Sequence, residues 1–299
     1  MYVLPKKKLS SGQAVLIVLL GMAVTLTVVL SIVSRSITDI SLSTTDEESA
    51  RAFSAAEAGI ENMILTPGAG TTDPVAIGDS TYVALSTGYG EGSTEFNFSG
   101  EKFTSGESAT VWLVSHDTDN NLTCSGGDCY EGSSIDICWG NDGATPDVNA
   151  PAIEVTFYYD TTAGWESGNY SNVLVSRSAF DPYNARTNDN YFTTIGTSGC
   201  TIGSTSYPFY SGTVALPSGK VAGDRTLFAR IKFLYNGTTA HALGIKNQGT
   251  NTFPSQGRII SSTGTSGNST RKVEVVDLYK SPLGIFEAGL FSVGDLKKD

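Results

Sequence analysis

A single apolar run dominates the N-terminal part of the chain. It extends from Ala14 to Val33 and contains no charged side chain. A helix needs about 20 residues to cross the roughly 30 Å hydrocarbon core of a bilayer, whereas the apolar part of a secretory signal peptide has only about 7–15. In lipid the backbone must satisfy its own hydrogen bonds, so the Val, Thr and Gly content does not prevent a helix there. The run therefore predicts a transmembrane helix over residues 14–33.

An amphipathic pattern follows the apolar run, and no proline separates the two. Apolar side chains recur at steps of three and four residues, which is the spacing of one helical face. These side chains are Phe53, Ala56, Ile60 and Ile64. We expect one continuous helix over residues 13–65, about 80 Å long at about 1.5 Å per residue, that ends before Pro67. Its second half should pack the apolar face on the downstream domain.

The remainder of the chain carries β signals. Short alternating or apolar runs are separated by turn clusters rich in Gly, Asn, Asp and Pro. The runs are 80–86, 108–115, 134–139, 152–159, 171–176, 226–234, 240–246, 258–262 and 271–279. They predict a β-rich, mainly antiparallel domain over residues 66–293 and a tail over 294–299, so the fold class is α+β. The domain is either a sandwich or a sheet with a long connecting insertion over residues 179–219.

Charge gives the predicted helix an orientation. Lys6, Lys7 and Lys8 precede the apolar run, and by the positive-inside tendency they stay in the cytoplasm while the chain after Val33 is exported. The net charge is −11, and only 16% of residues are charged. Phosphate binding needs clustered basic side chains, so nucleic acid is not an expected partner. We therefore expect a single-pass precursor in the cytoplasmic (inner) membrane with a soluble, acidic exported domain.

All four cysteines lie in the part of the chain that should be exported. An even number in an oxidising compartment predicts two disulfides, and four cysteines allow three pairings. The pairing we favour is Cys124–Cys129, which closes a small Gly-rich loop, with Cys138–Cys200 closing a long one. The spacings are not those of a zinc site, and free thiols are the alternative.

No catalytic constellation stands out, so we expect no enzyme activity and no cofactor. The only histidines, His116 and His241, lie in unrelated β-like segments, and the short motifs of common hydrolases and P-loop proteins are absent. The sequence from Asp117 through Asp119 to Asn121 begins like a calcium loop but lacks the later Gly and Glu, so a polar turn is favoured over a metal site. Tyr and Asn side chains over residues 183–210 form a candidate recognition surface for sugars or proteins.

The N-terminal residues resemble a known family. Lysines that lead to Gly12, followed by an apolar run, are similar to the leader of type IV pilins and pseudopilins, which a prepilin peptidase cuts after the Gly. In this chain Gln13 would then be the first mature residue, and residues 1–12 the basic leader. The residues after it, above all the AAEAG element over 55–59, resemble the N-terminal segment of PilX-type minor pilins. The resemblance covers roughly residues 6–65.

The resemblance implies a structural role with one departure from the family. Most members carry Glu at the fifth mature position, which here is Ile17. A minor subunit, placed at or near a filament tip or acting in priming, is therefore more consistent with this chain than a major subunit. The implied partners are other pilin-like subunits, the prepilin peptidase and the pilus assembly machinery, and the inner membrane before assembly. We expect Ile17, Gly21, Phe53 and Glu57 to contribute to helix assembly.

The mature protein would then lie in a cell-surface filament or pseudopilus, where it could also be adhesive. Helices that leave the bilayer would bury their apolar surface against one another, and small residues such as Gly21 would allow close approach. Two alternatives remain open. One is a membrane-tethered adhesin or binding ectodomain that never polymerises. The other is a secreted hydrolase with a helical anchor.

Overall fold

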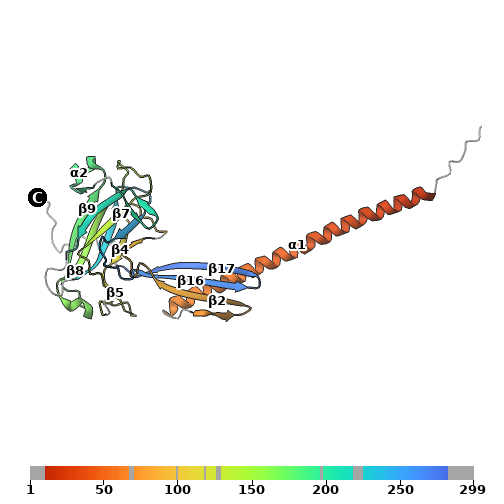
Figure 1. Cartoon of the computed structure of the whole chain (residues 1–299), viewed down its shortest axis with the longest axis horizontal. Coiled ribbons are helices and arrows are strands. Elements are labelled where there is room, and N and C mark those ends of the chain that lie inside the picture. The colour runs from red at the N-terminus through yellow and green to blue at the C-terminus, as the bar shows by residue number, and fades with distance from the viewer. Residues whose placement is uncertain are drawn as a thin grey trace, which may run out of the picture. The chain divides into compact units, whose positions relative to one another are not determined.

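The structure, a computed structural model, describes residues 11–66, 71–98, 100–117, 119–125, 129–195, 198–217 and 225–281. The chain divides into two compact units (Figure 1). Unit 1 comprises Met1–Leu85 and Ile260–Val275, and unit 2 comprises Ser86–Ile259 and Val276–Asp299. The predicted leader lysines and the predicted tail at 294–299 lie outside the described residues.

Unit 1 combines one long helix with a four-stranded sheet. The elements are α1 (Ser11–Leu65), β1 (Thr71–Ile77), β2 (Ser80–Gly88), β16 (Gly257–Ser266) and β17 (Ser269–Leu278). The strand order is β1-β2-β16-β17, and β1 pairs with β2 in antiparallel register. The predicted continuous helix is confirmed over its whole length, because α1 is unbroken from Ser11 to Leu65. The helix shares its unit with β16 and β17, which come from near the other end of the chain.

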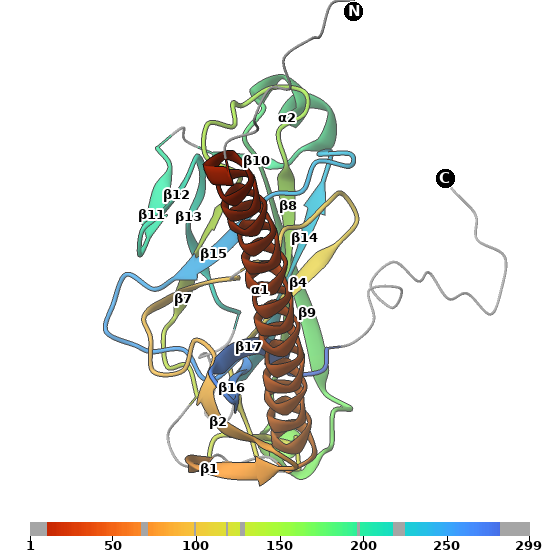
Figure 2. The same ribbon diagram turned by 90° about the vertical axis from the view of Figure 1, so that its right-hand side faces the viewer.

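The packed segment of α1, residues 48–65, lies along this sheet (Figure 1, Figure 2). Its buried positions are Ala52, Ala55, Ala56, Gly59, Ile60 and Met63. Three of them, Ala55, Ile60 and Met63, form one hydrophobic cluster with Tyr82, Ala84 and Ile260 of the sheet. The predicted face is only half right: Ala56 and Ile60 are buried, but Phe53 and Ile64 are each 46% exposed. The buried face is centred on alanine and glycine rather than on the large apolar side chains.

Small residues are required in the packed segment because helix and sheet backbones approach closely. A Cβ added at Gly59 would meet the Ser262 hydroxyl and, at 2.7 Å, the Tyr82 ring. A Cβ added at Gly264 of β16 would meet the Ala52 carbonyl oxygen and, at 2.5 Å, the Ala56 backbone nitrogen. Larger residues at these positions would push the helix off the sheet. The AAEAG element singled out in the sequence thus supplies Ala55, Ala56 and Gly59 of this contact, and Ala52 lies one turn before it.

Unit 2 is a β-sandwich. One sheet has the order β10-β9-β8-β14-β4, and its members are β10 (Thr193–Thr194), β9 (Val173–Asp181), β8 (Ala152–Asp160), β14 (Arg225–Leu234) and β4 (Ser108–Trp112). The other has the order β13-β7-β15-β3, with β13 (Phe209–Ala215), β7 (Ser134–Trp139), β15 (Leu243–Lys246) and β3 (Glu95–Asn97). Among the described residues, the strands of these two sheets pair in antiparallel fashion, except for the short parallel contact between β9 and β10. The expected mainly antiparallel β-rich region is confirmed.

The core of unit 2 lies between these two sheets. A single cluster of buried residues joins Val155, Phe157 and Ile231 of the first sheet to Ile137 and Trp139 of the second. Trp139 is fully buried, and its indole nitrogen donates to the Pro151 carbonyl at 2.8 Å. The buried aromatic residues therefore fill a core between sheets, which favours the sandwich over the single sheet.

The two predicted disulfides are both present. Cys124 and Cys129 are joined with Cα atoms 5.4 Å apart, and Cys138 and Cys200 with Cα atoms 6.0 Å apart. The second bond ties β7 to the small hairpin of β11 (Cys200–Ile202) and β12 (Thr205–Tyr207). All four cysteines of the chain are thus paired.

Candidate functional site

The first part of α1 presents the largest exposed apolar surface among the described residues. In this exposed segment, residues 13–47, every side chain is exposed. Within the predicted span the large apolar side chains have exposed fractions from 48% at Val33 to 66% at Leu16. The helix is long and apolar enough to cross a membrane. A monomer in water would not leave such a surface uncovered, so lipid or other protein must cover it.

The two threonines of the predicted span are compatible with lipid. The Thr25 hydroxyl donates to the Gly21 and Met22 carbonyls at 3.0 and 2.9 Å. The Thr27 hydroxyl donates to the Val24 carbonyl at 2.8 Å. These bonds to the preceding turn satisfy each donor within the helix, so neither threonine carries an unpaired donor into hydrocarbon.

The four residues expected to contribute to assembly all lie on open surface of α1. Ile17 is 64% and Phe53 46% exposed, and Glu57 is exposed. A Cβ added at Gly21 would meet nothing within 4 Å, so the helix surface is open there to a close neighbour. The expected processing point lies at the start of the helix, because α1 begins at Ser11, one residue before Gly12 and two before Gln13. Cleavage between Gly12 and Gln13 and assembly through α1 remain predictions.

The two histidines occupy separate places in unit 2. His241 is 5% exposed, its Nδ1 accepts from the Asn141 backbone N–H at 3.2 Å, and its backbone pairs with Phe103. Burial lowers the pKa of His241 below its ordinary value. His241 is therefore a core histidine with a structural partner, and nothing brings it into a shared site with His116.

His116 lies in an aromatic setting at the end of β5 (Ser115–His116), which pairs with β6 (Leu122–Thr123). Its ring stacks on Tyr279 with centroids 3.9 Å apart and meets the edge of Trp112 at 4.5 Å. Burial lowers the pKa of His116 to about 4, against a smaller opposing effect of Asp117. The imidazole is therefore neutral at neutral pH, with one nitrogen as donor and the other as acceptor.

The candidate calcium loop forms a self-contained turn between β5 and β6. The Asp117 carboxylate accepts from the Asp119 and Asn121 backbone N–H groups at 2.9 and 2.8 Å and from the Asn121 side chain at 3.1 Å. The hydrogen bonds from Asn121 and Asp119 lower the pKa of Asp117. Its oxygens are already engaged, and within the described ranges no cluster of three His, Cys, Asp or Glu side chains could hold a metal ion.

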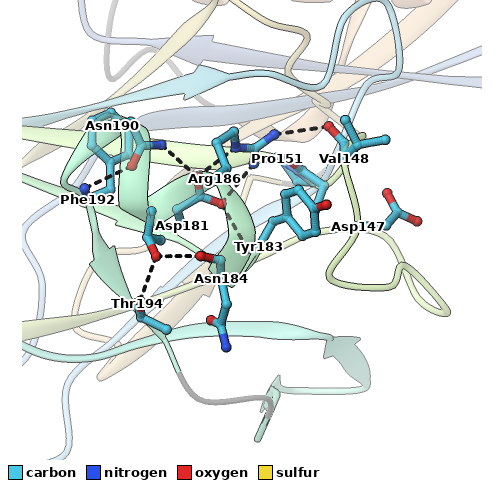
Figure 3. A network of polar contacts seen from close by, with 12 residues as sticks. Asp147, Val148, Pro151, Asp181, Tyr183, Asn184, Arg186, Asn190, Phe192 and Thr194 are labelled. Atoms are coloured by element: carbon cyan, nitrogen blue, oxygen red, sulfur yellow. Dashed lines mark hydrogen bonds and ion pairs between the residues drawn. The ribbon is translucent and has the colours of Figure 1, made fainter.

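The first part of the expected insertion at 179–219 is held by an ion pair that sequence reasoning did not identify, and the later part forms strands, of which β13 belongs to the second sheet. Arg186, on α2 (Asn184–Asn190), donates to the fully buried carboxylate of Asp181 through Nε at 2.7 Å and Nη2 at 2.8 Å. The same guanidinium donates to the Val148 and Ala150 carbonyls at 3.0 and 2.8 Å (Figure 3). It also lies over the Tyr235 ring, 4.1 Å from its centroid.

This network fixes the α2 loop rather than leaving a charge free for a ligand. Asn190 and the Tyr183 backbone N–H also donate to Asp181 (Figure 3). Burial raises the pKa of Asp181, but these hydrogen bonds and the Arg186 charge outweigh it and hold the pKa below its ordinary value. The next residue after α2, Tyr191, is 90% exposed. The predicted recognition surface thus contains one rigidly supported, outward tyrosine.

Comparison with known proteins adds no family to these observations. The chain matches no family model, no curated protein and no solved structure.

Proposed function

We propose that the protein is a minor structural subunit of a type IV pilin-like filament or pseudopilus, assembled through α1. The observation that carries the proposal is the division of one continuous helix into the exposed segment, residues 13–47, and the packed segment, residues 48–65. A simple anchor needs only about 20 apolar residues. Here about 14 further exposed residues follow Val33 before the helix meets its sheet. Each of them lengthens the exposed helix by about 1.5 Å.

The apolar pattern supports helix–helix contact beyond the predicted span. Positions spaced alternately three and four residues apart are apolar without exception from residue 16 to residue 40. They are Leu16, Leu19, Ala23, Leu26, Leu30, Val33, Ile37 and Ile40. Such a repeat is the seam of packed helices. Ile37 and Ile40 lie outside the predicted span among polar residues and are 63% and 66% exposed, so lipid alone does not explain them.

The first test is the mature N-terminus, measured by mass spectrometry in cells with and without prepilin peptidase. We expect a chain that begins at Gln13 when the peptidase is present and at Met1 when it is absent. Gly12→Leu should block cleavage, and Ser10→Ala should not. A filament-associated chain that still carries Lys6–Lys8 would contradict the proposal.

The second test asks whether the seam has protein neighbours. A photo-crosslinking residue at position 40 should capture other subunits in purified filaments, and one at position 42 should capture far less. Leu42 is a matched control, because it is 61% exposed but lies on the opposite side of the helix from the seam. Equal capture at both positions, or none, would favour the alternative of a membrane-tethered ectodomain that does not polymerise.

A further inference from the structure

A polar pocket of about 680 Å³ lies within unit 2. Its volume is in the range of small-molecule sites, roughly 300–1,000 Å³. Four Ser and Thr side chains line it: Ser115, Thr123, Ser125 and Ser255. His116 and Tyr279 supply aromatic surface in the same pocket. The expected role of α1 does not involve this pocket.

One side chain that lines the pocket carries a buried atom without a partner. His116 Nδ1 is inaccessible to solvent and has no hydrogen-bond partner among the residues that the structure describes. A buried polar atom left unpaired is destabilising, because it has lost its hydrogen bonds to water and gained none in return. Native proteins pair almost all such atoms, so an exception calls for an explanation. A small rearrangement of the ring that brings a ligand hydroxyl to this nitrogen would remove the cost.

The backbone around His116 is held in place, so only the imidazole ring has to turn when a ligand binds. The Cys124–Cys129 disulfide closes the loop beside Thr123 and Ser125. Cys129 is 5% exposed and packs in one hydrophobic cluster with Trp112, and its Sγ accepts from the Ser115 backbone N–H at 3.4 Å. A site held in place before binding loses less conformational entropy when a ligand arrives.

The charges around the pocket favour a neutral ligand. Its one cationic side chain among the described residues, Arg258, is engaged by Asp277, with Nη2 and Oδ2 2.8 Å apart. Glu91 and Asp117 add negative charge to the lining. Phosphate, sulfate and carboxylate groups would therefore meet net repulsion. Hydroxyl groups suit the lining better, because a hydroxyl both donates and accepts and so matches Ser, Thr and neutral His.

We propose that this pocket binds a short neutral saccharide, with a sugar hydroxyl hydrogen-bonded to His116 and others to the Ser and Thr hydroxyls. The ligand class follows from the combination of many hydroxyl partners, aromatic surface and no free cation. The binding site is independent of filament assembly, so the assay below needs neither peptidase nor filament. If no saccharide binds in this assay, the proposed structural role of the protein is not affected.

The test is proton NMR of the full chain in detergent, titrated with neutral glucose, galactose and mannose oligosaccharides. The chain has only two histidines, so one variant assigns both imidazole signals. A bound neutral saccharide should shift the His116 signals and leave those of His241 in place. A second titration with free monosaccharides distinguishes a site that binds single sugars from one that needs a longer glycan.

Variants locate the binding. His116→Ala should weaken binding at least tenfold, and Ser125→Ala, at an exposed hydroxyl of the lining, a few fold without disturbing the fold. Tyr191→Ala is the control, because Tyr191 is exposed and does not line the pocket. Loss of binding in Tyr191→Ala alone would move the site to the α2 loop and overturn the proposal. Stronger binding of phosphorylated or sialylated sugars, or no shift of His116 with any neutral saccharide, would overturn it equally.

Discussion

The two segments of α1 use apolar residues in opposite ways. The exposed segment carries Leu, Val and Ile side chains that nothing in the described chain covers. The packed segment buries Ala52, Ala55, Ala56 and Gly59, and leaves the larger Phe53 exposed. In the packed segment, close approach of backbones decides which residues fit. In the exposed segment, no described part of this chain lies close enough to limit the size of the side chains, so large apolar residues fit there.

The difference also indicates which segment depends on an external partner. Full burial of one large apolar side chain is worth about 1.5–3 kcal/mol relative to exposure. The packed segment obtains this energy from its own sheet. The exposed segment obtains none of it from the folded chain, so lipid or neighbouring helices must supply it. Paired substitutions, one in each segment, test this distinction.

The largest contrast should come from a charge introduced into each segment. Leu26→Arg places a cation near the middle of the predicted span, where insertion scales give a cost of about 2.5–3.5 kcal/mol. We expect loss from the membrane fraction and from filaments, measured by immunoblot. Leu65→Arg is the control, since Leu65 is 74% exposed at the end of the packed segment. Membrane retention of the Leu26 variant would show that the exposed segment is not a span.

A matched pair of methionines tests where the helix is packed. Met63 is 1% exposed and Met22 is 64% exposed. Met63→Ala removes buried volume and should lower the free energy of unfolding by about 2–5 kcal/mol. Met22→Ala should change it by less than about 0.5 kcal/mol in detergent. Urea unfolding of the two purified variants provides the measurement, and similar losses would refute the division into two segments.

A matched pair of glycines should give effects of opposite sign. Ala is favoured over Gly in a helix by roughly 0.5–1 kcal/mol, so Gly21→Ala should be neutral or stabilising. Gly59→Ala should destabilise by about 1–3 kcal/mol, because the new methyl group meets Ser262 and Tyr82. The midpoint of thermal unfolding reports both effects. Stabilisation by Gly59→Ala would mean that helix and sheet are less closely packed than described.

The smallest effect should come from the ion pairs of the packed segment. Arg51 pairs with Glu47 at 2.5 Å and with Asp79 at 3.7 Å, and these side chains are 50%, 63% and 91% exposed. Exposed pairs contribute at most about 1 kcal/mol and are screened by salt. Arg51→Ala should therefore lower the unfolding midpoint only slightly, and less at high salt. A loss as large as that of Met63→Ala would show that charge, not close packing, holds the helix on its sheet.

Much of the fold could be predicted from periodicity and cysteine spacing. All nine runs predicted as strands contain or overlap one, and the disulfide pairing is confirmed. The weaker strands were missed for local reasons. β1 contains Pro74 and a register shift between Thr71 and Val75, and β13 has a register shift between Tyr210 and Thr213. Both irregularities interrupt the period-two pattern by which a strand is recognised.

The interiors of the two units were harder to predict. The spacing of large apolar residues predicted that Phe53 would be buried, because a hydrophobicity pattern gives more weight to Phe than to Ala. In the structure the close approach of the sheet leaves room only for small residues on the buried face. The Arg186–Asp181 pair and the pocket at His116 depend on contacts between residues far apart in sequence, such as His116 with Tyr279. The exposed segment of α1 was predictable as a long helix because apolar run length and the absence of proline are local features of the sequence.

Half of the sheet that covers α1 arrives very late in the chain. The helix face ends near Met63, but β16 and β17 contribute residues 260–275 to the same unit. During synthesis, the alanine face must therefore wait for almost two hundred intervening residues before the last strands of its sheet are made. A prematurely terminated polypeptide would leave that face exposed to solvent, so we expect truncated molecules to be preferred substrates of proteases.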